Sequence, residues 1–366
     1  MRGELVVLAT RSMEDYADSV VEEMQTFPDF YGKGYRKNVR GELRTVTFAD
    51  GEIEVELHSS IRGKDVFLFG SAARNSYGLS VEQNKLELYH AIDALRRSQP
   101  GRITLFEPFC TSSRSDRTTR RNSVGFWVHY KTLSSLGVDQ IITYQLHSDK
   151  SKTVVDPRVC AIEDVPASPL VMEYLTGRIV RKPDVLNEEV KDTWLFCSVD
   201  AGGESVARTY ARAFGTKLVI AHKQRNYDKT NSVEAINILS DTDIGGKHVW
   251  IVDDMIDTGG SVYALIKELN ARGVGDVNIA VIHPVLSDPA TDRLCELHEA
   301  GMLNQVVAID TVDCTGLTER LPFLHVVSSA RLSAEIVMRM HEEQSLSPFF
   351  DPFDPRHYLS SLKLFL

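Results

Sequence analysis

Short runs of hydrophobic residues alternate with longer amphipathic segments along most of the chain. The short runs have the length and apolar character of buried strands, and the longer segments repeat their hydrophobic positions with the period of a helix. The predicted strands are residues 5–9, 65–69, 102–106, 140–144, 194–199, 217–221, 248–252, 277–282 and 305–309. The predicted helices are residues 12–24, 85–97, 125–136, 204–214, 261–272 and 333–341. Because strands alternate with helices, we predict an α/β fold with mainly parallel sheets flanked by helices.

A polar, proline-bearing stretch at residues 149–169 separates two halves that each read as a series of strands and helices. We therefore predict two domains, residues 1–165 and 166–340, followed by a C-terminal extension at residues 341–366. Residues 27–44 and the tail from residue 351 fit the pattern less well. We expect these two segments to be surface insertions or docking arms.

Composition narrows the class of partner. The chain has 366 residues, of which 43% are hydrophobic, and this is enough to build two cores. Its formal net charge of -10 creates no overall basic field, so we predict small-molecule partners rather than nucleic acid or a membrane. Five scattered cysteines without a Cys-x-x-Cys pair argue against a disulfide framework or a thiolate zinc site. With no hydrophobic run of signal-peptide or membrane-spanning length, we predict a soluble, cytoplasmic protein.

The most informative stretch combines acids with a glycine-rich loop. A strand-like run at residues 248–252 precedes it and a helical pattern follows it, so residues 253–261 are predicted to form the turn at a strand's carboxyl end. Small residues at a helix N-terminus favour a bound phosphate, and here they are Thr258, Gly259, Gly260 and Ser261. The acids beside them are Asp253, Asp254 and Asp257. Carboxylates this close repel a phosphate unless they hold sugar hydroxyls or hydrated Mg²⁺.

A solvent-facing turn that happens to carry these residues is the alternative interpretation of the stretch. An ATPase of the common Walker type is a disfavoured alternative, because no Gly-x-x-x-x-Gly-Lys-Ser/Thr sequence occurs. The stretch resembles the phosphoribosyl-diphosphate fingerprint that phosphoribosyltransferases share with ribose-phosphate diphosphokinases. The resemblance implies that Asp253 and Asp254 engage the ribose hydroxyls, while the loop from Asp257 to Ser261 holds the 5-phosphate.

Three segments of the first half resemble the diphosphokinases in particular. The resemblance implies that Phe48, Asp50 and Glu52 receive the adenine of ATP bound across a subunit boundary, although Phe48 alone would more often be a core residue. Residues 108–117 match the family's ATP loop, whose charged positions are Arg114, Asp116 and Arg117. An ordinary exposed polar loop is the alternative there. His147 matches a histidine that contacts the metal on ATP, and a structural histidine is its alternative.

The second half adds two further matches. Asp200, followed by Gly202 and Gly203, matches a second metal-linked acid whose glycine pair lets backbone approach a diphosphate. Lys223 and Arg225 match the start of the family's mobile catalytic loop, and we predict that these two cations are catalytic. A flexible charged loop is the alternative interpretation.

Together these matches identify residues 45–350 as a member of the ribose-phosphate diphosphokinase family. Membership implies two phosphoribosyltransferase-like domains, Mg²⁺ as cofactor, ATP and ribose 5-phosphate as substrates, and a homodimer or larger homo-oligomer. The implied reaction transfers the β,γ-diphosphoryl group of ATP to the ribose 1-hydroxyl for nucleotide biosynthesis.

The sequence also departs from the family's usual pattern. Ser115 replaces a usual glutamine, Gln145 replaces a usual acid, and residues 149–155 lack the family's regulatory stretch. The family's usual allosteric control and hexamer are therefore not expected here. A catalytically silent regulatory subunit stays open as an alternative function, and so does a phosphoribosyltransferase.

Overall fold

The computed structural model describes residues 3–28, 30, 39–118, 121–200, 202–225, 233–240 and 242–362. The chain divides into two compact units. The first comprises residues 1–166, 311–313 and 328–351, and the second comprises residues 167–310, 314–327 and 352–366. Each unit has its own mainly parallel sheet, which confirms the predicted α/β class. The domain limits predicted from the sequence, at residues 165 and 340, stay predictions.

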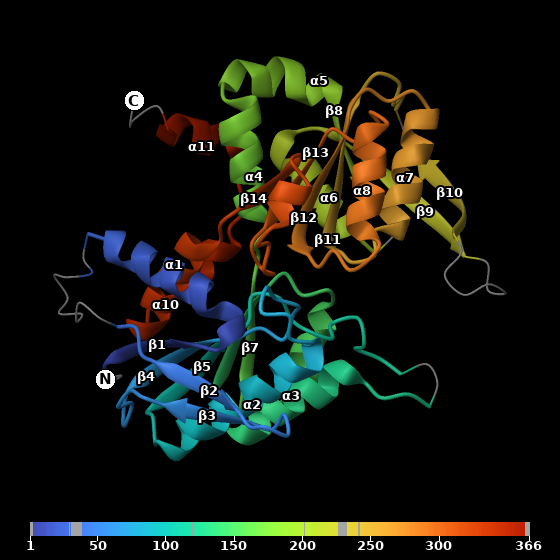
Figure 1. The fold of residues 1–366 in the computed structure, drawn as a ribbon. Helices are drawn as coiled ribbons and strands as arrows, with labels where there is room; N and C mark the ends of the chain where they lie inside the picture. Colours follow the sequence, from blue (N-terminus) through green and yellow to red (C-terminus); the bar gives the residue numbers. More distant parts are fainter. Residues whose placement is uncertain are drawn as a thin grey trace. The chain divides into compact units, whose positions relative to one another are not determined.

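The first unit contains a five-stranded parallel sheet in the order β1-β4-β5-β6-β7 and a separate β2-β3 hairpin (Figure 1). The strands are β1 (Leu5–Ala9), β2 (Leu43–Thr47), β3 (Ile53–Leu57), β4 (Asp65–Phe69), β5 (Arg102–Phe106), β6 (Gln140–Tyr144) and β7 (Ala161–Val165). The helices are α1 (Glu14–Thr26), α2 (Val81–Arg97), α3 (Gly125–Leu136) and α10 (Ala330–His341). Short 3-10 turns lie at Arg11–Met13, Asp149–Val154 and Ser347–Phe350.

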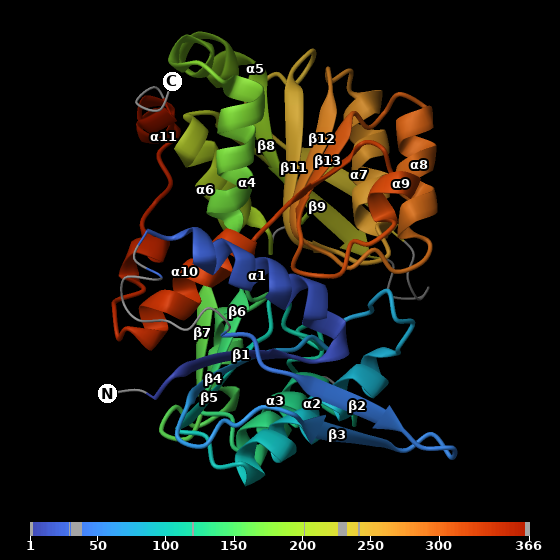
Figure 2. The same cartoon turned by 60° about the vertical axis from the view of Figure 1, so that its left-hand side comes forward.

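Helices cover both faces of this sheet, and for that reason β1 and β4 are buried at every position. On one face, Leu68 and Leu105 pack with residues of α2 and α3 in a single apolar core. On the other face, Phe69 of β4 stacks on Phe106 of β5 with ring centroids 4.9 Å apart and meets Tyr16 of α1. Figure 2 shows the β2-β3 hairpin beside α2, against which β3 packs.

The second unit contains a seven-stranded sheet in the order β10-β9-β8-β11-β12-β13-β14, in which the β9-β10 pair is antiparallel. The strands are β8 (Trp194–Ser198), β9 (Lys217–Arg225), β10 (Val233–Leu239), β11 (His248–Ile256), β12 (Val277–Pro284), β13 (Gln305–Ile309) and β14 (Leu324–Val327). The helices are α4 (Ser168–Tyr174), α5 (Lys191–Thr193), α6 (Glu204–Phe214), α7 (Gly260–Ala271), α8 (Ala290–Glu299), α9 (Leu317–Arg320) and α11 (Pro355–Leu362). Two π-helical segments, Leu175–Val180 and Val185–Val190, follow α4.

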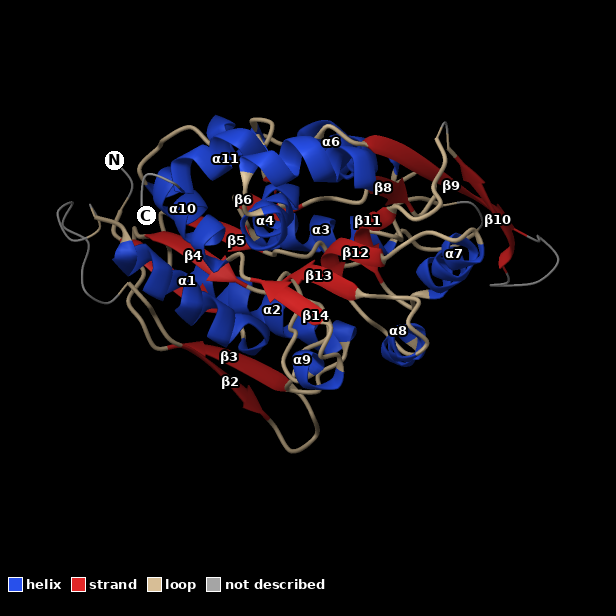
Figure 3. Ribbon diagram, turned by 90° about the horizontal axis from the view of Figure 1, so that it is seen from above, coloured by secondary structure: helices blue, strands red, loops and turns tan. Residues whose placement is uncertain are grey.

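Figure 3 shows α7 and α8 on one side of this sheet and α4 and α6 on the other. Leu265 of α7 and Leu294 of α8 belong to one apolar core with the strands. Across the sheet, the rings of Trp194 and Phe196 pack against Phe214 of α6. β11 therefore lies at the centre of a sheet that is covered on both faces, and its end is where ligands bind in open α/β sheets.

Several ends of elements differ from those predicted. β9 and β11 each run four residues beyond the predicted end, and the pattern missed β2, β3, β7, β10 and β14. Polar residues continue β9 and β11 because neighbouring strands keep pairing with them, which hydrophobicity does not record.

The segments that fitted the pattern poorly are partly described. Within residues 27–44, the backbone of Arg40 forms an isolated parallel β-bridge with Val7 of β1, and β2 begins at Leu43. Residues 29 and 31–38 lie outside the described residues. In the tail, α11 buries Leu359 in the second unit, and residues 363–366 lie outside the described part. Among the described residues, no helix is both long and apolar enough to cross a membrane.

Candidate functional site

The acid pair of the fingerprint lies in a strand rather than in a turn. β11 continues to Ile256 and α7 begins at Gly260, so the turn is limited to residues 257–259. The prediction of a turn over residues 253–261 is therefore wrong at both ends. The reason is pairing with β12, where Asp253 lies opposite Val281 and Met255 lies opposite His283. The pairing keeps both aspartates on a fixed strand end, which suits a binding site better than a loose turn does.

The turn itself depends on one glycine. Gly259 has a φ of 70°, in the left-handed region that favours glycine. The first helical hydrogen bond of α7 then runs from the Tyr263 N–H to the Gly259 carbonyl, at 2.8 Å. Thr258 is exposed, and Asp257 and Ser261 are half-buried around the helix N-terminus. The first N–H groups of a helix have no acceptors within the helix, so this end of α7 attracts an anion.

Arg293 of α8 also contacts this turn. Its Nη1 atom donates a hydrogen bond of 2.7 Å to the carbonyl oxygen of Thr258. Sequence reasoning missed Arg293 because it lies 35 residues from Thr258. A topological signal was available: α7 and α8 follow successive parallel strands, which puts their N-termini at the same edge of the sheet.

A second glycine loop meets the first at this edge. It follows β8, the parallel neighbour of β11, and leads into α6. The Asp200 carboxylate accepts hydrogen bonds from the N–H groups of Gly202 and Gly203, at 2.8 and 3.2 Å. A Cβ atom on Gly203 would lie 3.7 Å from Oδ1 of Asp253. The structure thus brings the Asp200 loop to the fingerprint acids, although 53 positions separate Asp200 from Asp253 in the sequence.

The charges at this edge are unbalanced. Burial raises the pKa of Asp253 well above its ordinary value, and the nearby carboxylates of Asp254 and Asp200 raise it further. The Asp254 N–H donates a 3.0 Å hydrogen bond to Oδ1 of Asp253, which acts in the opposite direction without reversing the shift. Hydroxyl donors or a cation would therefore stabilise the ionised Asp253.

These acids fit a divalent cation that phosphate oxygens also hold. Among the described residues, no group of three or more His, Cys, Asp or Glu side chains is arranged to enclose a metal. Mg²⁺ typically keeps several waters and takes only one or two carboxylates together with substrate phosphates. Ser198 adds a buried hydroxyl, for which the described residues offer no hydrogen-bond partner, close to Gly203. The donor set suits Mg²⁺ that arrives with its substrate.

Lys223 and Arg225 lie at the end of β9. Their backbones pair with β10, Lys223 opposite Ile236 and Arg225 opposite Val233. The sequence placed them at the start of a loop, and this prediction is corrected because β10 extends the sheet to Arg225. Residues 226–232, which follow them, lie outside the described residues.

In the first unit, Phe48, Asp50 and Glu52 form the turn of the β2-β3 hairpin. The Phe48 N–H donates to the Glu52 carbonyl at 2.8 Å, and Gly51 at the tip has a φ of 94°. Phe48 is 47% exposed, so the interpretation of it as a core residue is wrong. An exposed aromatic ring beside two exposed acids is available to a purine or to another subunit.

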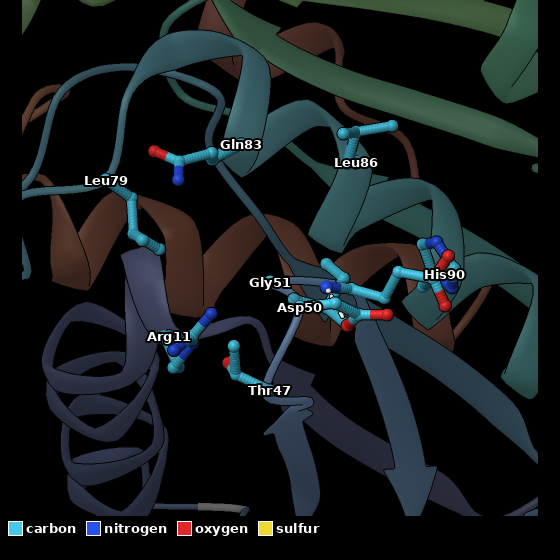
Figure 4. Close-up of a pocket in the computed structure, with 10 residues that line it drawn as sticks. Arg11, Thr47, Asp50, Gly51, Leu79, Gln83, Leu86 and His90 are labelled. Carbon is cyan, nitrogen blue, oxygen red and sulfur yellow. Dashed lines mark hydrogen bonds between the residues drawn. The ribbon is translucent and has the colours of Figure 1, made fainter.

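A cavity of about 750 Å³ lies between this hairpin and α2 (Figure 4). Asp50 and Glu52 line it from the hairpin, and Gln83 and His90 line it from α2. Arg11 also lines the cavity, but its guanidinium binds the buried Glu87 carboxylate at 2.6 Å. The carboxylates of Asp50 and Glu52 make the lining of the cavity suitable for donor groups such as an exocyclic amine.

The predicted ATP loop is anchored to the helices around it. Arg114 and Arg117 are exposed and Asp116 is half-buried. Oγ of Ser115 accepts a 2.9 Å hydrogen bond from the Gly125 N–H, at the start of α3. A second contact of the loop was not predicted from the sequence: Nζ of Lys85 in α2 donates to Oγ of Ser112 at 3.1 Å.

A buried polar network lies at the start of the same loop. Tyr130 of α3 donates a hydrogen bond to the Glu107 carboxylate, and its hydroxyl lies 2.6 Å from Sγ of Cys110. Burial raises the pKa of the Cys110 thiol well above its ordinary value, and the Glu107 carboxylate raises it further. Cys110 is therefore a neutral structural thiol rather than a nucleophile.

His147 lies three residues beyond the end of β6, where it is exposed. The preceding Gln145 has a φ of 43°, and the Leu146 N–H donates to Asp164 at 2.9 Å. These contacts fix the backbone before His147 at the carboxyl end of a parallel strand. The metal-binding role of His147 stays a prediction.

Comparison with known proteins covers both units. Residues 5–137 match the N-terminal domain of ribose phosphate pyrophosphokinase, and residues 162–300 match a phosphoribosyl transferase domain. Ribose-phosphate pyrophosphokinase 1 of Streptococcus pneumoniae serotype 4 is 31% identical over 306 residues, which cover 83% of this chain and 87% of that protein. The ribose-phosphate pyrophosphokinase of Chromobacterium violaceum is 32% identical over 306 residues, covering 83% and 85% of the two chains.

A solved structure agrees with these matches. The crystal structure of phosphoribosylpyrophosphate synthetase from Mycobacterium smegmatis superposes with a TM-score of 0.76 at 28% identity, covering 93% of this chain and 99% of that one. The predicted fold of two phosphoribosyltransferase-like domains is thereby confirmed. The chain belongs to the ribose-phosphate pyrophosphokinase family.

Proposed function

We propose that this protein transfers the β,γ-diphosphoryl group of ATP to the 1-hydroxyl of ribose 5-phosphate, releasing AMP. One observation carries the proposal: the half-buried acids of β11 stand directly before the anion-attracting N-terminus of α7. That arrangement suits a phosphorylated sugar, since hydroxyls bind the acids and phosphate binds the helix end. Membership of the family, through relatives named for this kinase, supports ATP as the second substrate.

In the second unit, Asp253 and Asp254 accept hydrogen bonds from the ribose hydroxyls. Asp257 and the segment from Thr258 to Ser261 hold the 5-phosphate at the start of α7. The raised pKa of Asp253 supports this assignment, because hydroxyl donors relieve the repulsion between the neighbouring carboxylates. The 1-hydroxyl is then oriented by groups that do not themselves react.

Mg²⁺ is the cofactor that we assign to the reaction. When bound, it supplies charge neutralisation on the phosphate oxygens of ATP. We assign Asp200 to metal binding in the second unit and His147 to metal binding in the first. Asp253 and Asp254 remain with the ribose.

On the ATP side, Phe48 stacks on the adenine, and Asp50 and Glu52 accept hydrogen bonds from its amine. Arg114 and Arg117 neutralise triphosphate oxygens, and Asp116 belongs to the same ATP-binding loop. The exposure of Phe48 supports a homo-oligomer in which the hairpin turn of one copy completes the ATP site of another. The five free cysteines support a reducing, cytoplasmic location.

Positioning and charge neutralisation supply most of the acceleration in phosphoryl-type transfer. Lys223 and Arg225 are the cations that we assign to the transferred diphosphoryl group. Stabilisation of this kind acts on charge that develops in the transition state, so it raises turnover rather than substrate affinity.

The experiment is a test of purified protein with ATP, Mg²⁺ and ribose 5-phosphate, scored by AMP release. We expect AMP to appear only when ribose 5-phosphate is present. AMP release without the sugar phosphate, or none at all, contradicts the proposal. Intact binding of both substrates without AMP would instead indicate a catalytically silent subunit, and consumption of phosphoribosyl diphosphate with a base would indicate a phosphoribosyltransferase.

A further inference from the structure

We propose that Arg293 is a positioning residue of the ribose 5-phosphate site, and this role rests on the function proposed above. Arg293 belongs to α8, outside the fingerprint, yet its guanidinium reaches back to the turn before α7. It holds the Thr258 carbonyl and adds positive charge beside the helix end that receives the phosphate.

The contact between Arg293 and the turn is direct. Nη1 donates a 2.7 Å hydrogen bond to the carbonyl oxygen of Thr258, one residue before Gly259 with its left-handed φ. A carbonyl dipole that turned toward the site would repel a phosphate. Because a hydrogen bond from a charged donor is stronger than a neutral one, the guanidinium restrains that carbonyl and favours N–H groups facing the ligand.

The charge of Arg293 is not neutralised by a neighbouring acid. Within the described part of the chain, no carboxylate forms an ion pair with Arg293, and the adjacent Asp292 binds Arg320 at 2.5 Å. An arginine and a helix N-terminus therefore contribute positive potential at the same turn. The complementary ligand is a phosphate dianion, which is the group that ribose 5-phosphate carries.

Gly260 supports the same assignment. Gly259 is a glycine for its backbone conformation, with a φ of 70°, whereas no positive φ explains Gly260. A Cβ atom on Gly260 would lie 3.3 Å from Nη1 of Arg293 and 3.9 Å from Cζ. The second glycine therefore makes room for the guanidinium over the first turn of α7.

The test measures binding of ribose 5-phosphate to the full-length protein by titration calorimetry, so it does not depend on turnover. We expect Arg293→Met to raise the Kd for ribose 5-phosphate roughly tenfold, with a smaller rise for Arg293→Lys, which keeps the charge. The Kd for MgATP should stay within about twofold, because Arg293 acts on the sugar-phosphate turn. Arg320→Met is the matched control, since Arg320 binds Asp292 instead of the turn.

A double-mutant cycle separates the proposed contact from a direct clash with the ligand. Gly260→Ala should weaken ribose 5-phosphate binding severalfold in the wild-type background. It should have little effect in Arg293→Met, because the guanidinium that the added Cβ atom would displace is then absent. Equal effects in both backgrounds would overturn the inference, as would an unchanged Kd in Arg293→Met or a wild-type protein that binds no ribose 5-phosphate. If Arg293→Met does not fold, Arg293→Gln takes its place in the cycle, because Gly260→Ala alone does not separate the two causes. Binding without AMP release would count against the proposed reaction only.

Discussion

The environment of Asp253 opposes the charge of its carboxylate. Its carboxylate is half-buried next to Asp254 and Asp200, and the pKa is raised well above the ordinary value of 3.8 by burial first and by those acids second. The native protein therefore keeps this proton at pH values where the unfolded chain has lost it. It follows that the free energy of unfolding falls as pH rises from about 3.8 through the raised pKa.

We therefore expect Asp253→Asn to stabilise the ligand-free protein at neutral pH by on the order of 1 kcal/mol while it abolishes ribose 5-phosphate binding. The stability difference should grow as pH rises through the same window, because asparagine does not titrate. Thermal unfolding of both proteins across that window measures the effect. An Asn variant that is less stable than wild type at neutral pH would contradict the charge argument.

Lys223 and Arg225 are tested by turnover. Removing either side chain in Lys223→Ala or Arg225→Ala should lower kcat by about 10²-fold or more and leave the KM for ribose 5-phosphate nearly unchanged. Lys217→Ala is the control, since Lys217 starts the same strand and binds Thr242. An unchanged kcat in both catalytic variants would show that the assignment is wrong.

At the scale of elements, the ATP loop and α3 depend on each other through Ser115. α3 has Val124 at its N-cap and no capping bond from that residue, and Oγ of Ser115 accepts from the Gly125 N–H instead. The Phe126 N–H donates to the Ser115 carbonyl at 3.1 Å. Ser115 stands where the resemblance implies a glutamine, and its short hydroxyl has a structural use because it caps the helix that follows.

We expect Ser115→Ala to lower the free energy of unfolding by about 1 kcal/mol, the usual cost of a lost cap, and to raise the KM for ATP. Ser115→Gln should raise the KM for ATP as well, because a glutamine side chain loses the short contact with Gly125. Chemical denaturation and steady-state kinetics measure the two effects. Ser123→Ala in the same loop is exposed and serves as control; matching effects from both alanine variants would remove Ser115 from this role.

The hydrophobic pattern predicted some elements to the residue and misjudged others. β1, β4, β5 and β6 have the predicted bounds, since each is a short apolar run covered on both faces. The hairpin strands β2 and β3 were missed because they are half-buried and carry charges. β10 was missed because it is an edge strand whose pairing with β9 the local pattern does not encode.

At the scale of the whole molecule, the two substrates should protect different segments of the chain. Ribose 5-phosphate should slow hydrogen exchange in residues 257–263 and leave the β2-β3 hairpin unchanged, while ATP with Mg²⁺ should protect the hairpin. At about 100 times the Kd, binding adds about 2.7 kcal/mol, which slows amide exchange about 100-fold where opening breaks the site. Mass spectrometry of peptides reads both segments, and protection of the hairpin by ribose 5-phosphate alone would contradict the division of substrates.

The sequence by itself determined the α/β class, the type of most elements and the candidate residues for the site, because hydrophobic period and loop chemistry are local properties. Only the tertiary structure decided which distant groups meet. Asp200 reaches the fingerprint acids because β8 and β11 are parallel neighbours, and Arg293 reaches Thr258 because α8 begins at the same sheet edge as α7. Strand order and register set these contacts, and neither is written in the local pattern of the chain.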